Sequence, residues 1–229
     1  MALLENIQNN HSAFLDTLKH RFLDETRVSA LKKFFHAGFP TRKDEEYRYT
    51  NLREITEKDY NLFPTEHHNI TKEQLDELHL GEENFDWIVF INGQLHKELS
   101  KVSIENVEFM SFKHALNDDR YKEVFNKYFN KIADPELAFT NLNLAYCRNG
   151  FFMKVPKNVV IEKPIHVFYL SQNQKENTFY NTRNLLVAEE SSKVEVIESH
   201  HNFDSHFVFT NSVTEIFTYP NAKADWHKL

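Results

Sequence analysis

Two stretches near the carboxyl end decide how this chain folds: RNLLVAEESSKVEVIES (183–199) and NSVTEIFTYPNAKADWHKL (211–229). They match each other at an offset of 30 residues. The matching positions are Leu186 and Val187 with Ile216 and Phe217, and Lys193–Val196 with Lys223–Trp226. A repeat of two strands and a corner is typical of one coil of a β-solenoid.

An earlier copy of the same pattern lies in residues 160–167, at offsets of 26 and 29. It places Val160–Glu162 on Leu186–Ala188, and Ile165 and Val167 on Val194 and Val196. Three copies are few, and a β-sandwich also produces short strands about every 8 to 12 residues. The repeat alone therefore leaves both the solenoid and the sandwich open.

The region after Gly150 is predicted to consist of strands. Its apolar runs are short, rich in Val, Ile and Phe, and separated by turn residues, with no helical period between them. The predicted strands are Phe151–Val155, Val159–Ile161, Ile165–Leu170, Asn184–Val187, Lys193–Glu198, Phe207–Phe209, Val213–Phe217 and Ala224–Trp226.

The region before Gly150 is predicted to be mainly helical. Apolar residues recur at helical spacing through the first 40 residues, up to a capping glycine at Gly38. Further helices are expected from Thr71 to Gly81, from Asp119 to Phe129 and after Asp134-Pro135. A small β-hairpin is expected at 87–99, with Asn92-Gly93 as its turn, and another strand at 107–112. We therefore predict a mainly helical domain at 1–135 and a β-rich domain at 136–229.

Composition excludes several classes of function. The chain of 229 residues holds only 4 glycines, all placed as punctuation between elements, which leaves none for a glycine-rich phosphate loop. A formal net charge of -7 without a basic stripe argues against nucleic-acid binding. No apolar run is long enough to cross a bilayer, and one cysteine cannot form an internal disulfide. These features predict a cytoplasmic protein.

Four segments of the chain resemble the SufB/SufD family of iron-sulfur cluster assembly proteins, most closely the N-terminal half of a SufD-type subunit. They are TRKDEEYRYTNL (41–52), LNLAYCRNGFFMKVPKNVVIEKPIHV (142–167) and the two stretches quoted first, and they occur in the family's order. The resemblance implies an α+β protein, in which a helical N-terminal domain precedes a right-handed parallel β-helix. It also implies a complex in which SufB-type and SufD-type subunits pair and dock the SufC-type ATPase.

By the same resemblance, this sequence ends part-way through the β-helix, at Leu229. The family's later coils, its SufC-docking segment and its His- and Cys-bearing region would follow that point, so none of those residues is carried over. A truncated solenoid exposes an apolar end and unpaired strand edges, so we expect self-association through that edge. The resemblance implies an iron-sulfur cluster for the whole complex, but no cofactor bound by this part.

The histidine cluster ESHHNFDSH supplies His200, His201 and His206. Adjacent residues of a strand point to opposite faces, and the spacing matches no known set of metal ligands, so we expect surface or corner histidines. Cys147 ends an apolar helix and is expected in the core. We assign no catalytic, cofactor-binding or metal-ligating residue from the sequence.

Other polar and aromatic groups have similarly simple interpretations. The Asp44-Glu45-Glu46 run suits a solvated first turn of a helix capped by Thr41. Tyr47 and Tyr49 are expected in the core or an interface, because no basic groove accompanies them. The Glu189-Glu190 pair is expected at a corner, where its two carboxylates diverge.

Three hypotheses about function follow. The first is a non-catalytic scaffold or accessory subunit of the SUF machinery that supports iron acquisition and cluster assembly. The second is a β-solenoid or sandwich enzyme acting on carbohydrate, and the third a stand-alone protein-binding module. The sequence contains no GxGxxG, GxxxxGK[ST], HExxH, GxSxG or CxxC motif, which favours the first and third over an enzyme.

Overall fold

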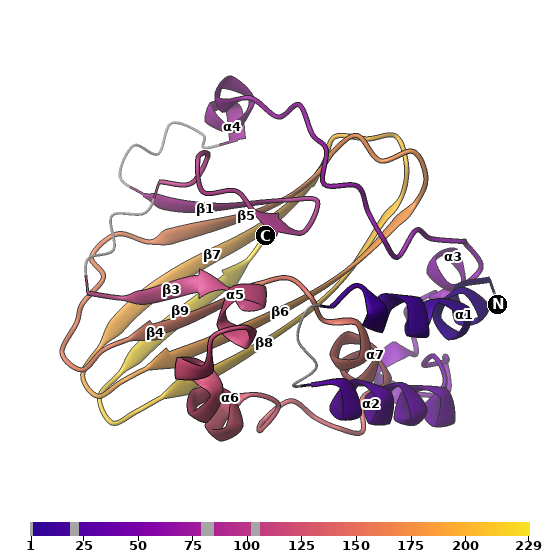
Figure 1. The fold of residues 1–229 in the computed structure, drawn as a ribbon, viewed down its shortest axis with the longest axis horizontal. Helices are drawn as coiled ribbons and strands as arrows, with labels where there is room; N and C mark the ends of the chain where they lie inside the picture. Colours follow the sequence, from indigo (N-terminus) through magenta and orange to yellow (C-terminus); the bar gives the residue numbers. More distant parts are fainter. Residues whose placement is uncertain (1, 19–22, 79–84, 102–105) are drawn as a thin grey trace.

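A computed structural model of the chain describes residues 2–18, 23–78, 85–101 and 106–229 (Figure 1). As predicted, the fold is α+β with a helical amino-terminal part. The helices are α1 (Ala2–Asp16), α2 (Asp24–Ala37), α3 (Arg53–Thr56), α4 (Lys72–Leu78), α5 (Phe112–Leu116), α6 (Lys122–Tyr128) and α7 (Ala138–Tyr146), with 3-10 turns η1 (Glu45–Tyr47) and η2 (Asp119–Tyr121). No helix of the described ranges is both long and apolar enough to cross a membrane.

The strands form two sheets, in the orders β2-β1-β5-β7-β9 and β3-β4-β6-β8. Their bounds are β1 (Asp86–Ile91), β2 (Gln94–Leu95), β3 (Glu108–Ser111), β4 (Phe151–Val155), β5 (Ile165–Ser171), β6 (Thr178–Ala188), β7 (Lys193–Asn202), β8 (Val208–Thr218) and β9 (Lys223–Lys228). From β4 onward the chain alternates between the two sheets, and each strand pairs in parallel with the one that follows in its own sheet. In Figure 1 these long strands run side by side, from orange to yellow along the chain.

The repeat of 30 residues sets the register of the last two coils. Leu186 pairs with Ile216 and Lys193 with Lys223, as the alignment predicts. The offsets of 26 and 29 for the earlier copy are wrong, because Met153 is the partner of Leu186 and Ile165 the partner of Val196.

The cause is a longer corner between β4 and β5. That corner spans residues 156–164, whereas the next two span 189–192 and 219–222. The predicted strand Val159–Ile161 lies in this corner and contributes only an isolated bridge, between Val160 and Lys193.

The corners stack as the strands do. Asn158, Ser191 and Asn221 lie at corresponding positions and all adopt positive φ, at 63°, 59° and 61°. The amide of Asn158 donates to the carbonyl of Glu190, and that of Ser191 donates to the carbonyl of Pro220, each at 3.0 Å. Successive corners are therefore hydrogen-bonded to each other, as the strands are.

Apolar side chains fill the space between the sheets. Alternate residues of each strand point inward, and each fully buried Val, Ile or Phe contributes about 1.5 to 3 kcal/mol. The buried set is Ile88, Phe90, Phe151, Met153, Val155, Ile165, Val167, Tyr169, Leu186, Val194 and Val196. The face of β6 that points away from this core carries Leu185 and Val187, which pack in the cluster that includes the α2 and α7 side chains.

The strands of the amino-terminal part extend both sheets. β1 pairs in parallel with β5, and β3 pairs antiparallel with β4. The outward side chains of β1 pack with Ile70 and with Leu75 of α4. The sheets therefore have helical segments against both outer faces, with α1, α2, α3 and α7 gathered on one side in Figure 1.

Local signals predicted several turns and caps. The capping box before α4 forms, with the Thr71 amide donating to Gln74 Oε1 at 3.0 Å and the Gln74 amide to Thr71 Oγ1 at 3.4 Å. The Gly81 predicted to end that helix lies outside the described residues. At the hairpin turn Gly93 has a φ of 81°, and a Cβ there would lie 2.3 Å from Asn149 Nδ2, so a larger residue would be strained and would displace the Asn149 side chain.

Other boundaries differ from the predictions. Helix α7 begins at Ala138 because the Asp134 carboxylate accepts the Glu136 amide in a turn at 2.9 Å instead of capping the helix. The second hairpin strand is only β2, because the chain bends back after it, with the Ser100 amide and hydroxyl both donating to the His96 carbonyl. Strand β3 gives way to α5 at Phe112, where Ser111 provides a cap that the sequence analysis missed.

Candidate functional site

The inner face of β7 changes from apolar to polar along its length. Val194 and Val196 belong to the core between the sheets, and the next two inward positions are Glu198 and His200. Alternation in a strand therefore places a carboxylate and an imidazole on the same face that buries the two valines earlier in β7. Glu198 is fully buried, and an unpaired charge there would be costly, so its partners define the site.

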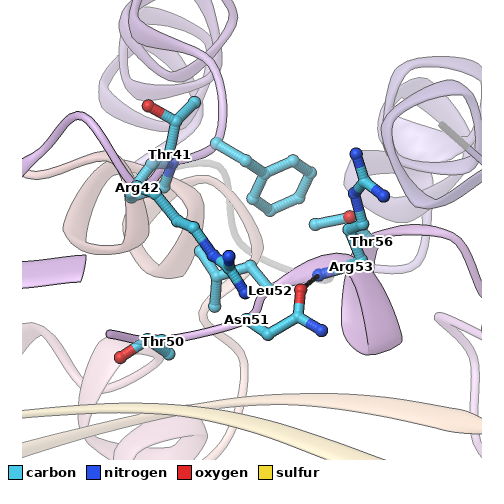
Figure 2. Close-up of a pocket in the computed structure, with 9 residues that line it drawn as sticks. Thr41, Arg42, Thr50, Asn51, Leu52, Arg53 and Thr56 are labelled. Carbon is cyan, nitrogen blue, oxygen red and sulfur yellow. Dashed lines mark hydrogen bonds between the residues drawn. The ribbon is translucent and has the colours of Figure 1, made fainter. Parts of the chain in front are cut away.

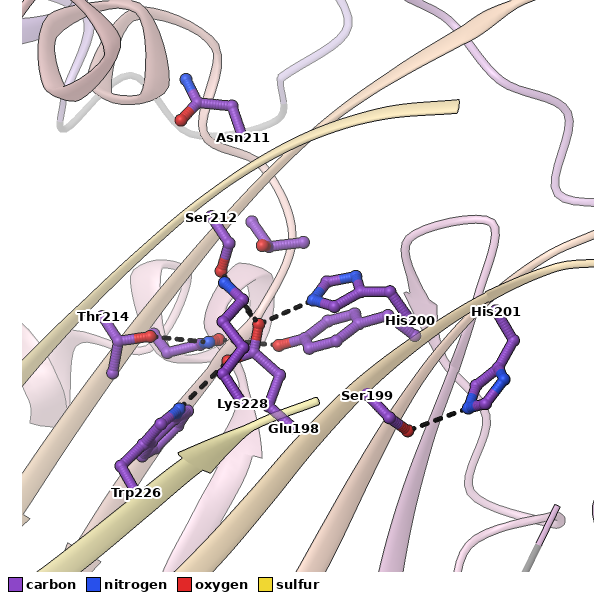
Figure 3. A network of polar contacts seen from close by, with 12 residues as sticks. Glu198, Ser199, His200, His201, Asn211, Ser212, Thr214, Trp226 and Lys228 are labelled. Atoms are coloured by element: carbon purple, nitrogen blue, oxygen red, sulfur yellow. Dashed lines mark hydrogen bonds and ion pairs between the residues drawn. The ribbon is translucent and has the colours of Figure 1, made fainter. Parts of the chain in front are cut away.

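Four side chains surround the Glu198 carboxylate (Figure 3). Oε1 accepts hydrogen bonds from His200 Nε2 at 2.7 Å, Lys228 Nζ at 3.1 Å and Ser212 Oγ at 3.3 Å. Oε2 accepts the indole N–H of Trp226 at 3.2 Å. Burial alone would raise the pKa of Glu198, but the hydrogen bonds and charges of His200 and Lys228 outweigh it and hold the pKa below its ordinary value.

The His200 ring is held from its other side by an aromatic contact. It stacks on Tyr169 with 4.9 Å between ring centroids and 12° between planes. The Tyr169 hydroxyl donates to Asn184 Oδ1 at 3.0 Å, and Asn184 Nδ2 donates to Thr214 Oγ1 at 3.2 Å. Burial and the nearby Glu198 charge raise the pKa of Tyr169 well above its ordinary value, so this hydroxyl stays protonated. The polar network thus joins both sheets.

A cavity of about 310 Å³ lies beside this network. The cavity is lined by hydroxyl, phenol and imidazole groups and by the apolar side chains of Leu170 and Val208; the polar groups are those of Ser171, Thr182, Thr210, Tyr169, Tyr180, His200 and His201. Burial, and then the charge of His200, lower the pKa of His201, which favours its neutral form. The cavity therefore offers both hydrogen-bonding groups and apolar surface to a small molecule.

A metal ion at Glu198 would have to compete with the donors already there. Both carboxylate oxygens are engaged, and one partner is the ammonium group of Lys228. Across the described ranges, no three His, Cys, Asp or Glu side chains form a group that could hold a metal ion. The described partners therefore form a hydrogen-bond network around the Glu198 carboxylate.

The three histidines singled out in the sequence do not converge. His200 contacts Glu198, whereas His201 Nε2 lies 3.0 Å from Ser199 Oγ on the other face of the strand, as strand alternation predicts. His206 is half-buried in the turn before β8, where its carbonyl accepts a hydrogen bond from Asn202.

The other singled-out residues have structural surroundings. Cys147 is fully buried, as expected, at the end of α7. Glu189 and Glu190 lie at a corner, also as expected, and pair with different lysines, Lys154 at 3.2 Å and Lys157 at 2.8 Å.

The acidic run begins a 3-10 turn, η1. Thr41 was predicted to cap this turn by accepting a hydrogen bond, but it donates instead. The Thr41 amide and hydroxyl donate to Asp44, which lowers the pKa of Asp44. Tyr47 packs against Phe139, but Tyr49 is 90% exposed, so the expectation of a core position fails for Tyr49.

Sequence reasoning missed a second buried charge pair. Arg183 and Glu215 lie at adjacent places in the β6–β8 ladder, on the face toward the helices, and their ion pair measures 2.7 Å. Glu215 also accepts backbone amides from Asn130, Lys131 and Ile132, at 2.8, 2.9 and 3.2 Å. The available signal was a pair of opposite charges on the strand face that also carries Leu185 and Val187.

Comparison with known proteins places the chain in a family. A family model described as the SufBD protein N-terminal region matches residues 3–167, and one described as the SUF system FeS cluster assembly, SufBD core domain, matches residues 169–229. The chain belongs to the SufBD family. The resemblance seen in the sequence is therefore confirmed, and the candidate site on β7 lies within the SufBD core match.

Curated relatives carry the same family name. An iron-sulfur cluster assembly SufBD family protein of Synechocystis is 25% identical over 80% of this chain and 42% of its own length. Relatives of that name from Staphylococcus epidermidis and Staphylococcus saprophyticus are each 24% identical, over 86% and 75% of this chain. The chain spans less than half the length of these curated relatives.

Proposed function

We propose that the chain acts as a non-catalytic scaffold or accessory subunit, of SufD type, in cytoplasmic iron-sulfur cluster assembly. The observation that carries the proposal is the pair of SufBD family matches, which together cover nearly the whole chain. In this role the iron and sulfur are cargo handled by a larger complex, and this part of the protein binds no resident cofactor.

We further propose that the two parallel sheets are the first coils of a right-handed β-helix that follows a mainly helical domain at 1–135. Two observations support this. The chain alternates between the sheets from β4 to β9, and the corners at Asn158, Ser191 and Asn221 stack by hydrogen bonds. A coil of this kind contacts only its neighbours, so further strands can be added at its end.

Strands β8 and β9 are the proposed sites of assembly. Each is the outermost strand of its sheet in the described residues. Backbone N–H and C=O groups that face away from β6 and β7 can pair with strands of a further coil, a SufB-type subunit or a second copy of the chain. In the helical part, the exposed side chain of Tyr49 is available to another subunit of the complex.

Co-expression tests the proposal directly. The chain would carry an affinity tag and be produced with the SufB-type and SufC-type proteins of its own organism. Native mass spectrometry would then give the mass and composition of the purified complex. We expect one complex that contains all three chains. Recovery of the tagged chain without either partner would contradict the proposed role.

A control separates specific assembly from adhesion of exposed strands. The same experiment would use an unrelated tagged protein with an open parallel sheet edge, which should retain neither partner. The tagged chain should also release reconstituted cluster only when its partners are present, because the proposal assigns the chemistry to the complex.

A further inference from the structure

A pocket in the helical part carries a chemistry that iron-sulfur assembly does not explain. Its volume is about 460 Å³, within the range of small-molecule sites. Two loops form it, one that follows α2 and one that leads into α3 (Figure 2). The buried Phe39 and Thr56, 7% and 4% exposed, form its innermost part, while Arg42 and Arg53 lie at its exposed rim.

The walls of the pocket are held in place by hydrogen bonds within each loop. Gly38, at φ 72°, ends α2 and turns the chain so that Phe39 packs on Phe34, with ring centroids 5.0 Å apart. Thr41 is tied to the Asp44 carboxylate at 2.7 Å through its amide. On the second loop, Asn51 Oδ1 accepts the Arg53 amide at 3.2 Å, which links two residues that line the pocket. The pocket is therefore formed before any ligand arrives.

The charge of the pocket is opposite to that of the protein. The chain has a net charge of -7, yet the described residues that line the pocket include two arginines and no acidic side chain. Four other arginines form ion pairs: Arg27, Arg48, Arg120 and Arg183. Arg42 and Arg53 have no such pair among the described residues, and Figure 2 shows Arg42 extending toward Leu52 and Asn51.

Two guanidinium groups beside an apolar interior select for a particular kind of molecule. Guanidinium binds phosphate and carboxylate groups through paired hydrogen bonds, and Phe39, Pro40 and Leu52 offer apolar surface to a flat group. We propose that this pocket is a binding site for a small organic anion, in which a flat apolar group carries a phosphate or a carboxylate. The anion lies between Arg42 and Arg53, and the apolar group lies over the inner part of the pocket.

Binding of phenyl phosphate and benzoate to the purified chain tests this site by isothermal titration calorimetry. At least one of the two should bind, and inorganic phosphate and benzyl alcohol should each bind at least about tenfold more weakly, since each supplies half of the required chemistry. If phenyl phosphate binds and benzoate does not, the site is selective for phosphate. If benzoate binds and phenyl phosphate does not, the site is selective for carboxylate. Failure of both, or equal binding of inorganic phosphate, would overturn the proposal.

Variants at the rim locate the binding. Arg42→Gln and Arg53→Gln should each weaken binding about tenfold or more. Arg48→Gln is the matched control, because Arg48 lies in the same segment but pairs with Glu45 at 3.8 Å and does not line the pocket. Thr50→Glu, at an exposed lining position, should abolish binding by placing a carboxylate there. An equal loss in Arg48→Gln would mean that binding follows net charge and would overturn the site.

Discussion

Glu198 is the residue where burial and charge compete most directly. Its carboxylate is fully buried yet accepts hydrogen bonds from His200, Ser212, Trp226 and Lys228. Those donors come from β7, β8 and β9, so one charge connects three strands in two sheets. The site therefore depends on the stacking of the coils, and a change at this carboxylate should be felt by the fold as a whole.

The hydrogen bonds of Glu198 should contribute to the free energy of unfolding in a way that depends on pH. Glu198→Gln should lower the free energy of unfolding by about 2 kcal/mol at pH 7, because it weakens hydrogen bonds to a charged acceptor. The pKa of Glu198 is lower in the folded state than its ordinary value of 4.5. The stabilisation is therefore complete above pH 4.5 and is lost as the pH falls through the lower folded value. Urea unfolding of both proteins between pH 7 and pH 3 measures it.

Glu195→Gln is the control for that measurement. Glu195 lies on the same strand but pairs across 3.5 Å with His227, and both side chains are partly exposed. Its replacement should change stability by less than about 0.5 kcal/mol. A pH-independent difference between the wild-type protein and Glu198→Gln would contradict the proposed charge network.

Ser191 occupies a backbone conformation that its side chain does not favour. Its φ is 59°, and the corresponding corners use asparagine, at Asn158 and Asn221. Asparagine tolerates the left-handed region better than serine. Ser191→Asn should therefore raise the free energy of unfolding by about 0.5 kcal/mol, and the reverse change, Asn158→Ser, should lower it by a similar amount. Denaturant unfolding of the two variants should give opposite signs, and a loss in both would contradict the argument.

At the scale of elements, the equal length of two corners explains what the sequence could predict. The segments 189–192 and 219–222 are equally long, so a fixed offset of 30 aligned β6 with β8 and β7 with β9. The longer segment 156–164, bounded by two prolines, broke that offset, and no local signal indicates how much chain a corner takes up. The sequence repeat therefore predicted the pairing register of the strands only where the corners between them have equal lengths.

The same comparison explains why β6 and β8 were predicted too short. Both strands continue through polar residues that resemble a turn, Asn181-Thr182 and Asn211-Ser212. Asn143 of α7 donates to the carbonyls of Thr182 and Asn211, each at 2.8 Å. A contact from a distant helix satisfies these backbone groups, and pattern rules cannot see it. The partners of Glu198 from β8 and β9 were hidden for the same reason.

The expected self-association of the chain would use the edge of β9. The amide of Lys223 donates to Ser192, just before β7, and that of Leu229 donates to Glu198 of β7, so by alternation the amide of Ala224 faces away from β7. Ala224→Pro removes this edge donor without removing a bond to β7, and it should weaken association by at least about fivefold. Ala224→Val keeps the amide and is the control. Sedimentation equilibrium measures both, and equal association of the two variants would exclude this edge.

At the scale of the whole molecule, Glu215 joins the sheets to the helical part. It binds Arg183 of β6 and the amides of residues 130–132, which connect α6 to α7, and the Arg183 guanidinium also lies 4.9 Å from the Phe129 ring centroid. Both charged side chains are essentially unexposed. Loss of one partner leaves an uncompensated buried charge, so Glu215→Gln should cost about 3 to 5 kcal/mol.

Replacing both partners distinguishes an ion pair from an anchor for the backbone. If the two buried charges bound only each other, apolar residues could replace both at little cost in stability. The double variant Arg183→Met with Glu215→Leu would in that case be about as stable as the wild-type protein. Because Glu215 also accepts backbone amides, we expect the double variant to remain destabilised by about 2 kcal/mol or more. In hydrogen exchange, residues 130–132 should lose protection in this variant, while Glu123→Gln, an exposed change on α6, leaves them protected. Full recovery of stability with protected amides would show that the helical part is attached to the sheets by other contacts.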